Sequence, residues 1–409
     1  MIKRQIVIPK TSFISGSHKV FHWGGGVYRG YSDNEAGQTR MMLIDLERLY
    51  NIGLVRTSIA PIVSDEFGLI LQHDSIDFIS YSEEWTTKMF IDAALMVIDL
   101  QLALLEQELC LFDGHASNVL FDYTRPMFVD FGSIVPLSAS LSWFSDFFQS
   151  FMKPIAIRVG ADASFWFDLG KRTIEKKDAL SRVSVYREEF LTFLREVRNW
   201  LTTLKINAKT TPWSGYTQPT ETLTNDKQRV VFNLLDKLYS EGMTLIDIGA
   251  NQGWYSNLAV SRGYRVVSLD LDESCMTSLY LDAKSNSRKI LPLVENFLKP
   301  WVAQPPYQNA VDRLKCDVSL SLALVHHLVF SQYANFSSIA IGLNSFSKKY
   351  AIIEFPPSDD IFVKNWVTPE CSWYNLDRFI AEVSAYFPYH EVFDSYPPPR
   401  KMVLFSKER

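Results

Sequence analysis

The segment from residue 244 to residue 254 constrains this chain most, because an apolar strand ends there in a turn that carries two glycines. Its sequence is Thr-Leu-Ile-Asp-Ile-Gly-Ala-Asn-Gln-Gly-Trp. Gly249 and Gly253 let the backbone turn sharply and approach a ligand that a Cβ atom would obstruct. Asp247 stands in the strand where a carboxylate can meet a cation. The pattern predicts the entry to a nucleotide-type pocket.

The next strand, residues 264–270, is rich in β-formers and ends in an acid. Asp270 follows Asp247 by 23 residues (270 − 247), and this spacing suits a carboxylate that binds ribose hydroxyls. A nicotinamide-binding fold also places an acid there, but its turn requires Gly-x-Gly-x-x-Gly. Ala250 and Asn251 occupy the corresponding part of this turn. The sequence therefore favours S-adenosylmethionine over NAD.

With these motifs, residues 211–409 resemble the class I S-adenosylmethionine-dependent methyltransferases. The resemblance implies an α/β domain with a Rossmann-like, doubly wound, mostly parallel sheet that binds the cofactor at the carboxyl ends of its strands. The cofactor-binding residues that it implies are Asp247, Gly249, Ala250, Asn251, Gly253, Asp270, Leu271, Asp272, Asn296 and Leu324.

Within this set the resemblance assigns parts of the cofactor to different residues. Asp247, Gly249, Asn251 and Gly253 surround the methionine moiety, and Asp270 meets the ribose. Leu271 or Asp272 lies near the adenine. Asn296 is a departure, because the family usually carries an aspartate facing the adenine amine after its third strand.

Residues 317–328 are similar to the fourth strand of the family and the loop that closes over the transferring methyl group. His326 and His327 in this loop are candidates for catalysis, because a neutral histidine can take a proton from a substrate hydroxyl. The alternative is that they only line the pocket. Glu354, at the end of the apolar strand 350–354, is a further candidate, with a solvated or capping role as its alternative.

A second constellation lies in the first half of the chain and resembles the catalytic centre of protein kinases. Asp113 and Asn118 are five residues apart (118 − 113), and Asp130-Phe131-Gly132 begins 17 residues after Asp113 (130 − 113). The resemblance implies that Asp113 is a base, and that Asn118 and Asp130 hold Mg²⁺ against the phosphates of ATP. Residues 119–121 and 127–129 are expected to form the short hairpin between the two motifs.

The other parts of a kinase site depart from the pattern. The segment from Trp23 to Tyr28 is glycine-rich but lacks Gly-x-Gly-x-x-Gly, and no Val-Ala-Ile-Lys strand follows. Arg29 or Lys19 could replace the missing lysine, and Glu35 or Glu47 its partner on a helix. Two interpretations stay open, a kinase-like scaffold without phosphotransfer and an active kinase.

Over nearly its whole length the chain is similar to the NoeA-type, nodulation-linked methyltransferases and their bacterial relatives in surface-glycan and secondary-metabolite clusters. The segments that carry this resemblance are residues 27–29, 113–122, 125–126, 128–133, 211–213, 290–294 and 322–328. The family implies methyl transfer by the C-terminal half and leaves the acceptor open.

Length and composition agree with two domains. A chain of 409 residues with 47% hydrophobic content is too long for one ordinary core. We expect a kinase-like α+β domain over residues 1–206, a linker or lid over 207–225, and the methyltransferase domain over 226–409. Trp213 and Tyr216 are candidate lid residues.

Charge and cysteine usage exclude several classes of function. A net charge of −5 and a pI near 5.9 argue against a nucleic-acid binder, whose surface would be basic. The four cysteines form no Cys-x-x-Cys pair, so neither a zinc site nor a disulfide framework is predicted. No apolar run is long enough to span a membrane, and the basic first residues are not followed by the apolar core of a signal peptide. We expect a cytoplasmic protein and leave its oligomeric state open.

The sequence thus predicts an S-adenosylmethionine-dependent methyltransferase that methylates an oxygen of a glycan or small metabolite, with its kinase-like half recruiting substrate or acting as a scaffold. One alternative is a bifunctional enzyme that uses ATP and Mg²⁺ to phosphorylate an acceptor and then methylates it. The other is a non-catalytic assembly protein that binds S-adenosylmethionine.

Overall fold

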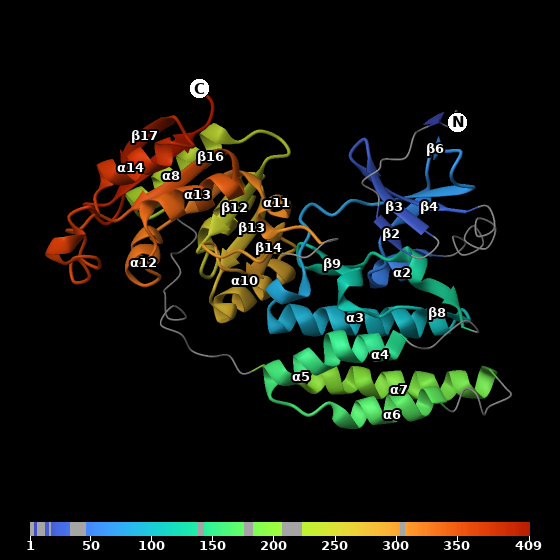
Figure 1. Cartoon of the computed structure of the whole chain (residues 1–409). Helices are drawn as coiled ribbons and strands as arrows, with labels where there is room; N and C mark the ends of the chain where they lie inside the picture. The colour runs from blue at the N-terminus through green and yellow to red at the C-terminus, as the bar shows by residue number, and fades with distance from the viewer. Residues whose placement is uncertain are drawn as a thin grey trace. The chain divides into compact units, whose positions relative to one another are not determined.

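The computed structural model describes residues 4–5, 13–15, 18–32, 46–137, 143–175, 183–206, 223–302 and 307–409. The chain forms two compact units (Figure 1). The N-terminal unit comprises Met1–Asp77, Tyr81–Glu83 and Thr87–Asn207, and the C-terminal unit comprises Phe78–Ser80, Glu84–Thr86 and Ala208–Arg409. Glu35, Trp213 and Tyr216 lie outside the described residues. In the described part of the chain, no helix is long and apolar enough to cross a membrane.

The N-terminal unit contains an antiparallel sheet of five strands in the order β2-β3-β4-β7-β5. Its strands are β2 (Phe13–Ser15), β3 (His18–Trp23), β4 (Gly26–Tyr31), β5 (Thr57–Ile59) and β7 (Leu69–His73). Gly24 and Gly25, with φ of 55° and 82°, form the two-residue turn between β3 and β4. Because such a hairpin turn needs positive φ, the glycine run of this segment is explained by the turn itself.

Shorter elements complete this part of the unit. A parallel pair joins β1 (Arg4–Gln5) to β6 (Ile62–Val63), and α2 (Glu47–Ile52) precedes β5. The expected hairpin is confirmed, since β9 (Val119–Asp122) pairs antiparallel with β10 (Arg125–Phe128). Likewise β8 (Leu109–Leu111) pairs with β11 (Ile134–Pro136). The short 3-10 helices are η1 (Ser82–Glu84), η2 (Ala116–Asn118) and η3 (Phe131–Ser133).

A layer of helices forms the rest of the N-terminal unit. It consists of α3 (Thr87–Leu105), α4 (Trp143–Phe147), the π-helical turn η4 (Phe148–Met152), α5 (Lys153–Val159), α6 (Ser164–Glu175) and α7 (Val183–Thr203). The aromatic residues of α4 are buried, and Phe144 lies 4.9 Å, ring to ring, from Phe193 of α7. These buried rings therefore build a core and offer no exposed platform for a substrate.

The C-terminal unit contains a mixed sheet of seven strands in the order β14-β13-β12-β15-β16-β18-β17. Its strands are β12 (Thr244–Ile248), β13 (Arg265–Asp270), β14 (Ile290–Val294), β15 (Cys316–Ser321), β16 (Ser347–Phe355), β17 (Tyr389–Asp394) and β18 (Lys401–Ser406). Strands β12 to β16 pair in parallel, whereas β18 runs antiparallel to β16 and β17. Strand order reverses between β12 and β15, the point where α/β sheets bind ligands.

Helices cover both faces of this sheet. They are α8 (Asp226–Leu238), α9 (Trp254–Ser261), α10 (Glu273–Ser285), α11 (Ala310–Arg313), α12 (Val325–Phe330), α13 (Phe336–Phe346), η6 (Pro369–Cys371) and α14 (Leu376–Ser384). Ile352 of β16 belongs to the core cluster shared with α8, α9 and α10. Three positions on, Phe355 points to the opposite face and packs on Phe336 of α13 and Phe379 of α14.

Side-chain caps set where several of these helices begin. The side chain of Asn225 accepts a hydrogen bond from the N–H of Gln228, and the side-chain oxygen of Gln228 accepts one from the N–H of Asn225, so α8 starts with a capping box. Asp272, Asn335 and Asn375 cap α10, α13 and α14. In each case one side-chain oxygen accepts hydrogen bonds from backbone N–H groups of the first turn.

Gly253, at the start of α9, is expected to be required for packing. Its φ is +78°, and a Cβ atom there would lie 2.3 Å from Cδ1 of the buried Leu279. Gly242 is a matched control. Its φ of +84° would strain an alanine in the same way, but no neighbouring atom lies within 4 Å of the position that the Cβ atom would take. Gly253→Ala should lower the free energy of unfolding by about 1–3 kcal/mol more than Gly242→Ala, measured by urea unfolding of the whole chain. Equal losses would show that Leu279 moves aside.

Candidate functional site

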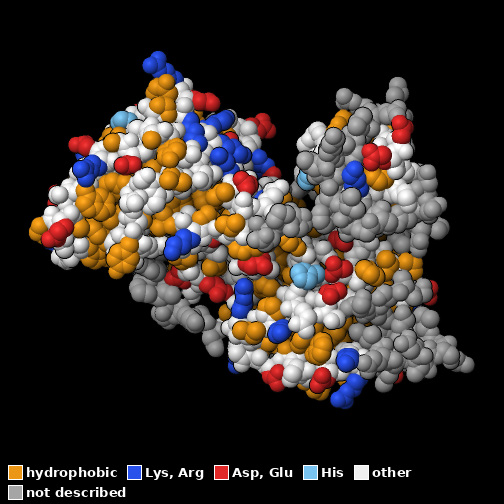
Figure 2. Space-filling model, in the orientation of Figure 1, with side chains coloured by type: hydrophobic (Ala, Val, Ile, Leu, Met, Phe, Trp, Pro, Cys, Tyr) orange, Lys and Arg blue, Asp and Glu red, His pale blue; other side chains and the backbone are white. Residues whose placement is uncertain are grey.

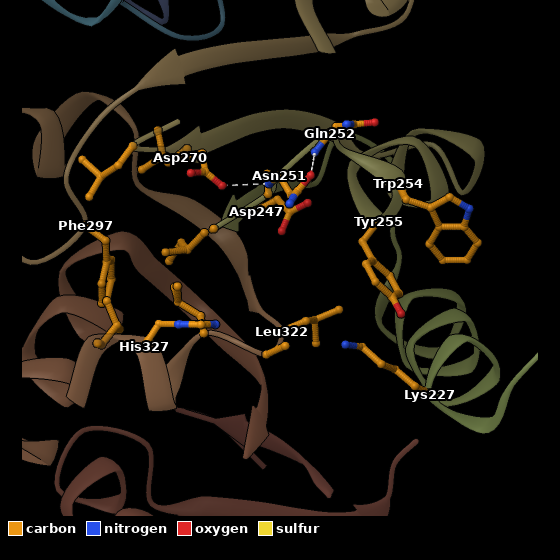
Figure 3. A pocket seen from close by; sticks show the side chains of 18 of the residues that line it. Lys227, Asp247, Asn251, Gln252, Trp254, Tyr255, Asp270, Phe297, Leu322 and His327 are labelled. Carbon is orange, nitrogen blue, oxygen red and sulfur yellow. Dashed lines mark hydrogen bonds between the residues drawn. The ribbon is translucent and has the colours of Figure 1, made fainter. Parts of the chain in front are cut away.

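The C-terminal unit contains a cavity of about 560 Å³ at the carboxyl ends of its parallel strands. This volume is within the range of small-molecule sites. The turn after β12, the ends of β13, β14 and β15, and the start of α12 contribute to its lining, together with α8 and residues 396–400 (Figure 3). The cavity thus lies at the switch point that the sequence motif predicts.

The turn after β12 forms one wall of the cavity. Asp247, Gly249, Ala250 and Asn251 line it. Gly249 has a φ of +74°, and a Cβ atom there would lie 3.0 Å from Leu324, which lines the cavity as well. A side chain at this position would be strained by the positive φ and would crowd Leu324.

Asp247 is buried, with 3% of its surface exposed. One of its carboxylate oxygens accepts a hydrogen bond of 2.6 Å from Oγ of Ser256, which in turn lies 2.8 Å from Oγ of Ser268. Burial, with a smaller contribution from the charge of Asp270, raises the pKa of Asp247 to about 7. The group therefore gains its negative charge near neutral pH.

Two acidic residues at the end of β13 have different roles. Asp270 lines the cavity, and its two oxygens accept hydrogen bonds from the N–H groups of Asn251 (2.8 Å) and Asp272 (3.0 Å). Asp272 lies outside the lining, because its carboxylate caps α10 through the N–H groups of Ser274 and Cys275. Of the two residues expected near an adenine, only Leu271 lines the cavity.

Gly253 is likewise not among the lining residues. The space that Leu279 occupies gives a packing reason for a glycine at this position, and the contact of Gly253 with a cofactor stays a prediction. Its neighbours Gln252, Trp254 and Tyr255 line the cavity, although no motif in the sequence singled them out.

The turn after β14 contributes Glu295, Asn296 and Phe297 to the lining. The side-chain oxygen of Asn296 accepts hydrogen bonds from the N–H groups of Leu298 (2.9 Å) and Lys299 (3.1 Å), so this side chain shapes the turn. Burial raises the pKa of Glu295 to about 7, and the nearby Glu84 carboxylate adds to the shift.

The two histidines after β15 are placed differently. His327 lines the cavity, whereas His326 is buried outside the lining with its ring 4.1 Å from that of His327. Burial lowers the pKa of His326 to about 3 and also lowers that of His327, for which the charge of Arg400 is a second cause. Both imidazoles are therefore neutral at neutral pH, and of the two only His327 can meet a ligand in the cavity.

Glu354 is fully buried and lies outside the lining, so it is neither solvated nor placed for catalysis. Its carboxylate accepts hydrogen bonds of 2.7 Å from Nζ of Lys227 and from Oγ of Ser395, and it lies 3.7 Å from the guanidinium of Arg400. Lys227 and Arg400 do line the cavity. Neither residue could be identified from the sequence, because neither belongs to a recognisable motif.

A second hollow, of about 710 Å³, adjoins the cavity at Ser331, which lines both. Trp366 and Trp373 contribute aromatic rings to it, and Tyr333 at its edge is almost fully exposed. Figure 2 shows hydrophobic side chains gathered at the end of the C-terminal unit that carries α12. Exposed apolar surface of this kind is a common mark of a binding region.

The kinase-like constellation of the N-terminal unit is organised around local hydrogen bonds. A carboxylate oxygen of Asp113 accepts a 2.8 Å hydrogen bond from the N–H of His115, and the N–H of Asp113 donates to Oγ of Ser133 at 2.7 Å. The amide of Asn118 lies 3.5 Å from the carbonyl oxygen of Asp113. The three expected residues are thus brought into one region by η2, the β9–β10 hairpin and η3.

Asp130 is paired with Arg29, whose guanidinium lies 2.6 Å from its carboxylate. Arg29 is only 4% exposed, whereas Lys19 pairs with the exposed Glu66, and Glu47 with the exposed Arg56. The positive charge of Arg29 therefore stands beside the carboxylate that would bind a metal. Among the described residues, no group of three or more His, Cys, Asp or Glu side chains could hold a metal ion.

One known protein is similar to this chain over most of its length. No family model matches it. It is 26% identical to the nodulation protein NoeA of Rhizobium meliloti (strain 1021) over 433 residues, which cover 91% of this chain and 90% of that protein. The chain is a homologue of NoeA. The resemblance found in the sequence is therefore confirmed, and it extends through both units.

The following solved structures resemble this chain only with low TM-scores and over at most half of its residues. Monomeric WbdD is 15% identical with a TM-score of 0.36, over 50% of this chain and 46% of that chain. Another WbdD structure, described as a bifunctional kinase-methyltransferase, has 17% identity and a TM-score of 0.35, over 46% and 40%. Magnesium protoporphyrin IX methyltransferase from Synechocystis PCC 6803, with bound SAH, has 13% identity and a TM-score of 0.34, over 47% and 90%. The chain thus spans less than half of the WbdD structures.

Because the pKa of Asp247 is near 7, we expect the affinity for S-adenosylhomocysteine to depend on pH. The resemblance places Asp247 near the methionine moiety, which carries a cationic amino group, so we expect the affinity for S-adenosylhomocysteine to rise roughly tenfold from pH 6 to pH 8 as Asp247 becomes charged. Asp247→Asn, which can still accept from Ser256, should remove this dependence in calorimetric titrations. Loss of the dependence in Glu295→Gln instead would contradict the assignment to Asp247.

The Arg29–Asp130 pair is expected to stabilise the N-terminal unit. Arg29→Met leaves a partly buried carboxylate uncompensated and should lower the free energy of unfolding by about 2–4 kcal/mol. The double variant Arg29→Met, Asp130→Asn should recover at least half of that loss, as measured by urea unfolding of both single variants and the double variant. Strict additivity of the two single losses would mean that the pair carries no coupling energy.

Proposed function

We propose that this chain is an S-adenosylmethionine-dependent methyltransferase that acts on an oxygen of a glycan or small-metabolite acceptor. The observation that carries the proposal is the Asp270 carboxylate, which lines the cavity and is tied to the glycine-bearing turn by the N–H of Asn251. Counted from the first strand of its sheet, the strand order is 3-2-1-4-5-7-6. The order reverses between β12 and β15, which is where open α/β sheets bind ligands.

The lining residues fit the parts of the cofactor. Asp270 retains lone pairs for ribose hydroxyls beyond its two backbone partners. Leu271 and Phe297 supply apolar surface on which an adenine can pack, next to the turn of Asn296. The backbone at Gly249 and the carboxylate of Asp247 border the part of the cavity that would hold the methionine moiety. When bound, the cofactor would supply an electrophilic methyl group on a sulfonium.

The remaining lining residues form an acceptor region. His327, Leu328, Ser331 and Gln332 come from α12 and the residues that follow it, and Arg400 from the segment before β18. Their task is to align the acceptor oxygen with the methyl group and to keep water away, because methyl transfer depends on near-attack geometry. The adjoining aromatic hollow could hold a further part of the acceptor.

For the N-terminal unit we favour substrate recruitment or a scaffold role. The ion pair of Arg29 with Asp130 supports this choice, because it places a fixed cation where phosphotransfer requires Mg²⁺. The bifunctional alternative requires Arg29 to release Asp130 in the presence of ATP and Mg²⁺. Tight binding of ATP with Mg²⁺ that is lost in Asp130→Ala would favour that alternative.

Substitution of two acidic residues, the last residue of β13 and the N-cap of α10, tests the proposal. Asp270→Asn should weaken the binding of S-adenosylhomocysteine at least tenfold, because a carboxylate that meets ribose hydroxyls is lost. Asp272→Asn is the matched control, since asparagine caps a helix equally well and Asp272 is outside the lining. The measurement is isothermal titration of the whole chain with S-adenosylhomocysteine and, separately, with NAD. Binding of NAD alone would overturn the proposal, and binding without transfer to any acceptor would favour the assembly alternative.

A further inference from the structure

The polar groups that line the cavity are separated by charge. Figure 3 shows Asp247 and Asp270 together on one side of the cavity, whereas Lys227 and His327 lie on the opposite side and point into it. Arg400 lines the same cavity. A bound molecule therefore meets carboxylates at the cofactor end and nitrogen groups at the other.

The carboxylates that pair with Lys227 and Arg400 are buried outside the cavity lining. Lys227 pairs with Glu354 at 2.7 Å, and Arg400 forms hydrogen bonds of 2.7 and 3.3 Å with Asp360. Glu354 and Asp360 are fully buried, and neither lines the cavity. Each cation is thus held in place by a carboxylate that a ligand cannot touch. Donors fixed in this way need little reorganisation to bind an anion.

His327 is poorly suited to be the base that an alcohol acceptor requires. Burial and the positive charge of Arg400 lower its pKa, whereas a good general base has a pKa near the working pH. His326 lies outside the lining, and Glu354 is held by Lys227. A neutral His327 can still donate one N–H to an acceptor oxygen.

We propose that the methyl acceptor is an oxyanion, a carboxylate or a phosphate monoester, which Lys227, Arg400 and the N–H of His327 hold in place. The proposal rests on the methyltransferase function proposed above and gives it a substrate class. In the transfer step a bond forms between the acceptor oxygen and the methyl carbon. The bond from that carbon to sulfur breaks and leaves its electron pair on sulfur. The acceptor loses one negative charge, and no proton has to be removed.

The test measures anion binding to the whole chain saturated with S-adenosylhomocysteine. Inorganic phosphate and acetate are the probes, methyl glucoside is the neutral comparison, and sodium chloride keeps ionic strength constant. We expect phosphate or acetate to bind and methyl glucoside not to bind. Binding of phosphate alone would identify a phosphate acceptor, and binding of acetate alone a carboxylate acceptor.

Variants of two lysines on the same helix locate the anion. Lys227→Gln should weaken anion binding at least fivefold, whereas Lys237→Gln should have no effect, because Lys237 is exposed and pairs with Glu391. Unchanged affinity for S-adenosylhomocysteine shows that Lys227→Gln is folded. Should it fail to fold, Lys227→Gln combined with Glu354→Gln removes both charges of the pair and serves in its place.

The outcomes separate this inference from the function on which it rests. Failure of the wild type to bind S-adenosylhomocysteine would overturn the proposed function itself. Normal binding of S-adenosylhomocysteine, with neither anion bound, would overturn only the oxyanion acceptor. A loss of S-adenosylhomocysteine affinity in Lys227→Gln, with anion binding intact, would assign Lys227 to the cofactor and also overturn the inference.

Discussion

The candidate site depends on the Asp270 carboxylate, which accepts hydrogen bonds from the N–H groups of Asn251 and Asp272. These charge-assisted bonds join the end of β13 to the turn after β12 and to the start of α10. Asn251 adopts a positive φ of 51°, which asparagine tolerates better than most other non-glycine residues, and its N–H is held by the carboxylate of Asp270. The wall of the cavity is therefore formed before a ligand arrives, and binding need not pay for ordering it.

A second buried carboxylate, Glu354, organises the opposite wall. An unpaired charge at this depth would be very costly, so Glu354 requires the cations that surround it. Lys227 comes from α8 and Arg400 from the segment before β18, and the antiparallel pairing of β16 with β18 brings Arg400 close to the strand that carries Glu354. The polarity of the cavity follows from this arrangement, because the acids are enclosed while the cations border the open space.

Sequence patterns predict the sheet better than the direction of its side chains. The strands at 244–248, 265–270 and 290–294 could be predicted because their apolar runs are bounded by turn residues. Asp272 could not be placed, since an acid after a strand can meet a ligand or cap the next helix with the same local sequence. Lys227 and Arg400 are 173 residues apart (400 − 227), and only the folded topology brings both to one carboxylate.

Asp130 and Asp270 show how one residue type acquires different roles after a strand. Asp270 is held by backbone N–H groups, which leave its remaining lone pairs open to a ligand, whereas Asp130 faces the fixed charge of Arg29. A guanidinium can balance a carboxylate as a metal ion does, but it cannot bridge that carboxylate to phosphate oxygens in octahedral geometry. The motif spacing of a kinase can therefore be retained for its packing and charge balance alone.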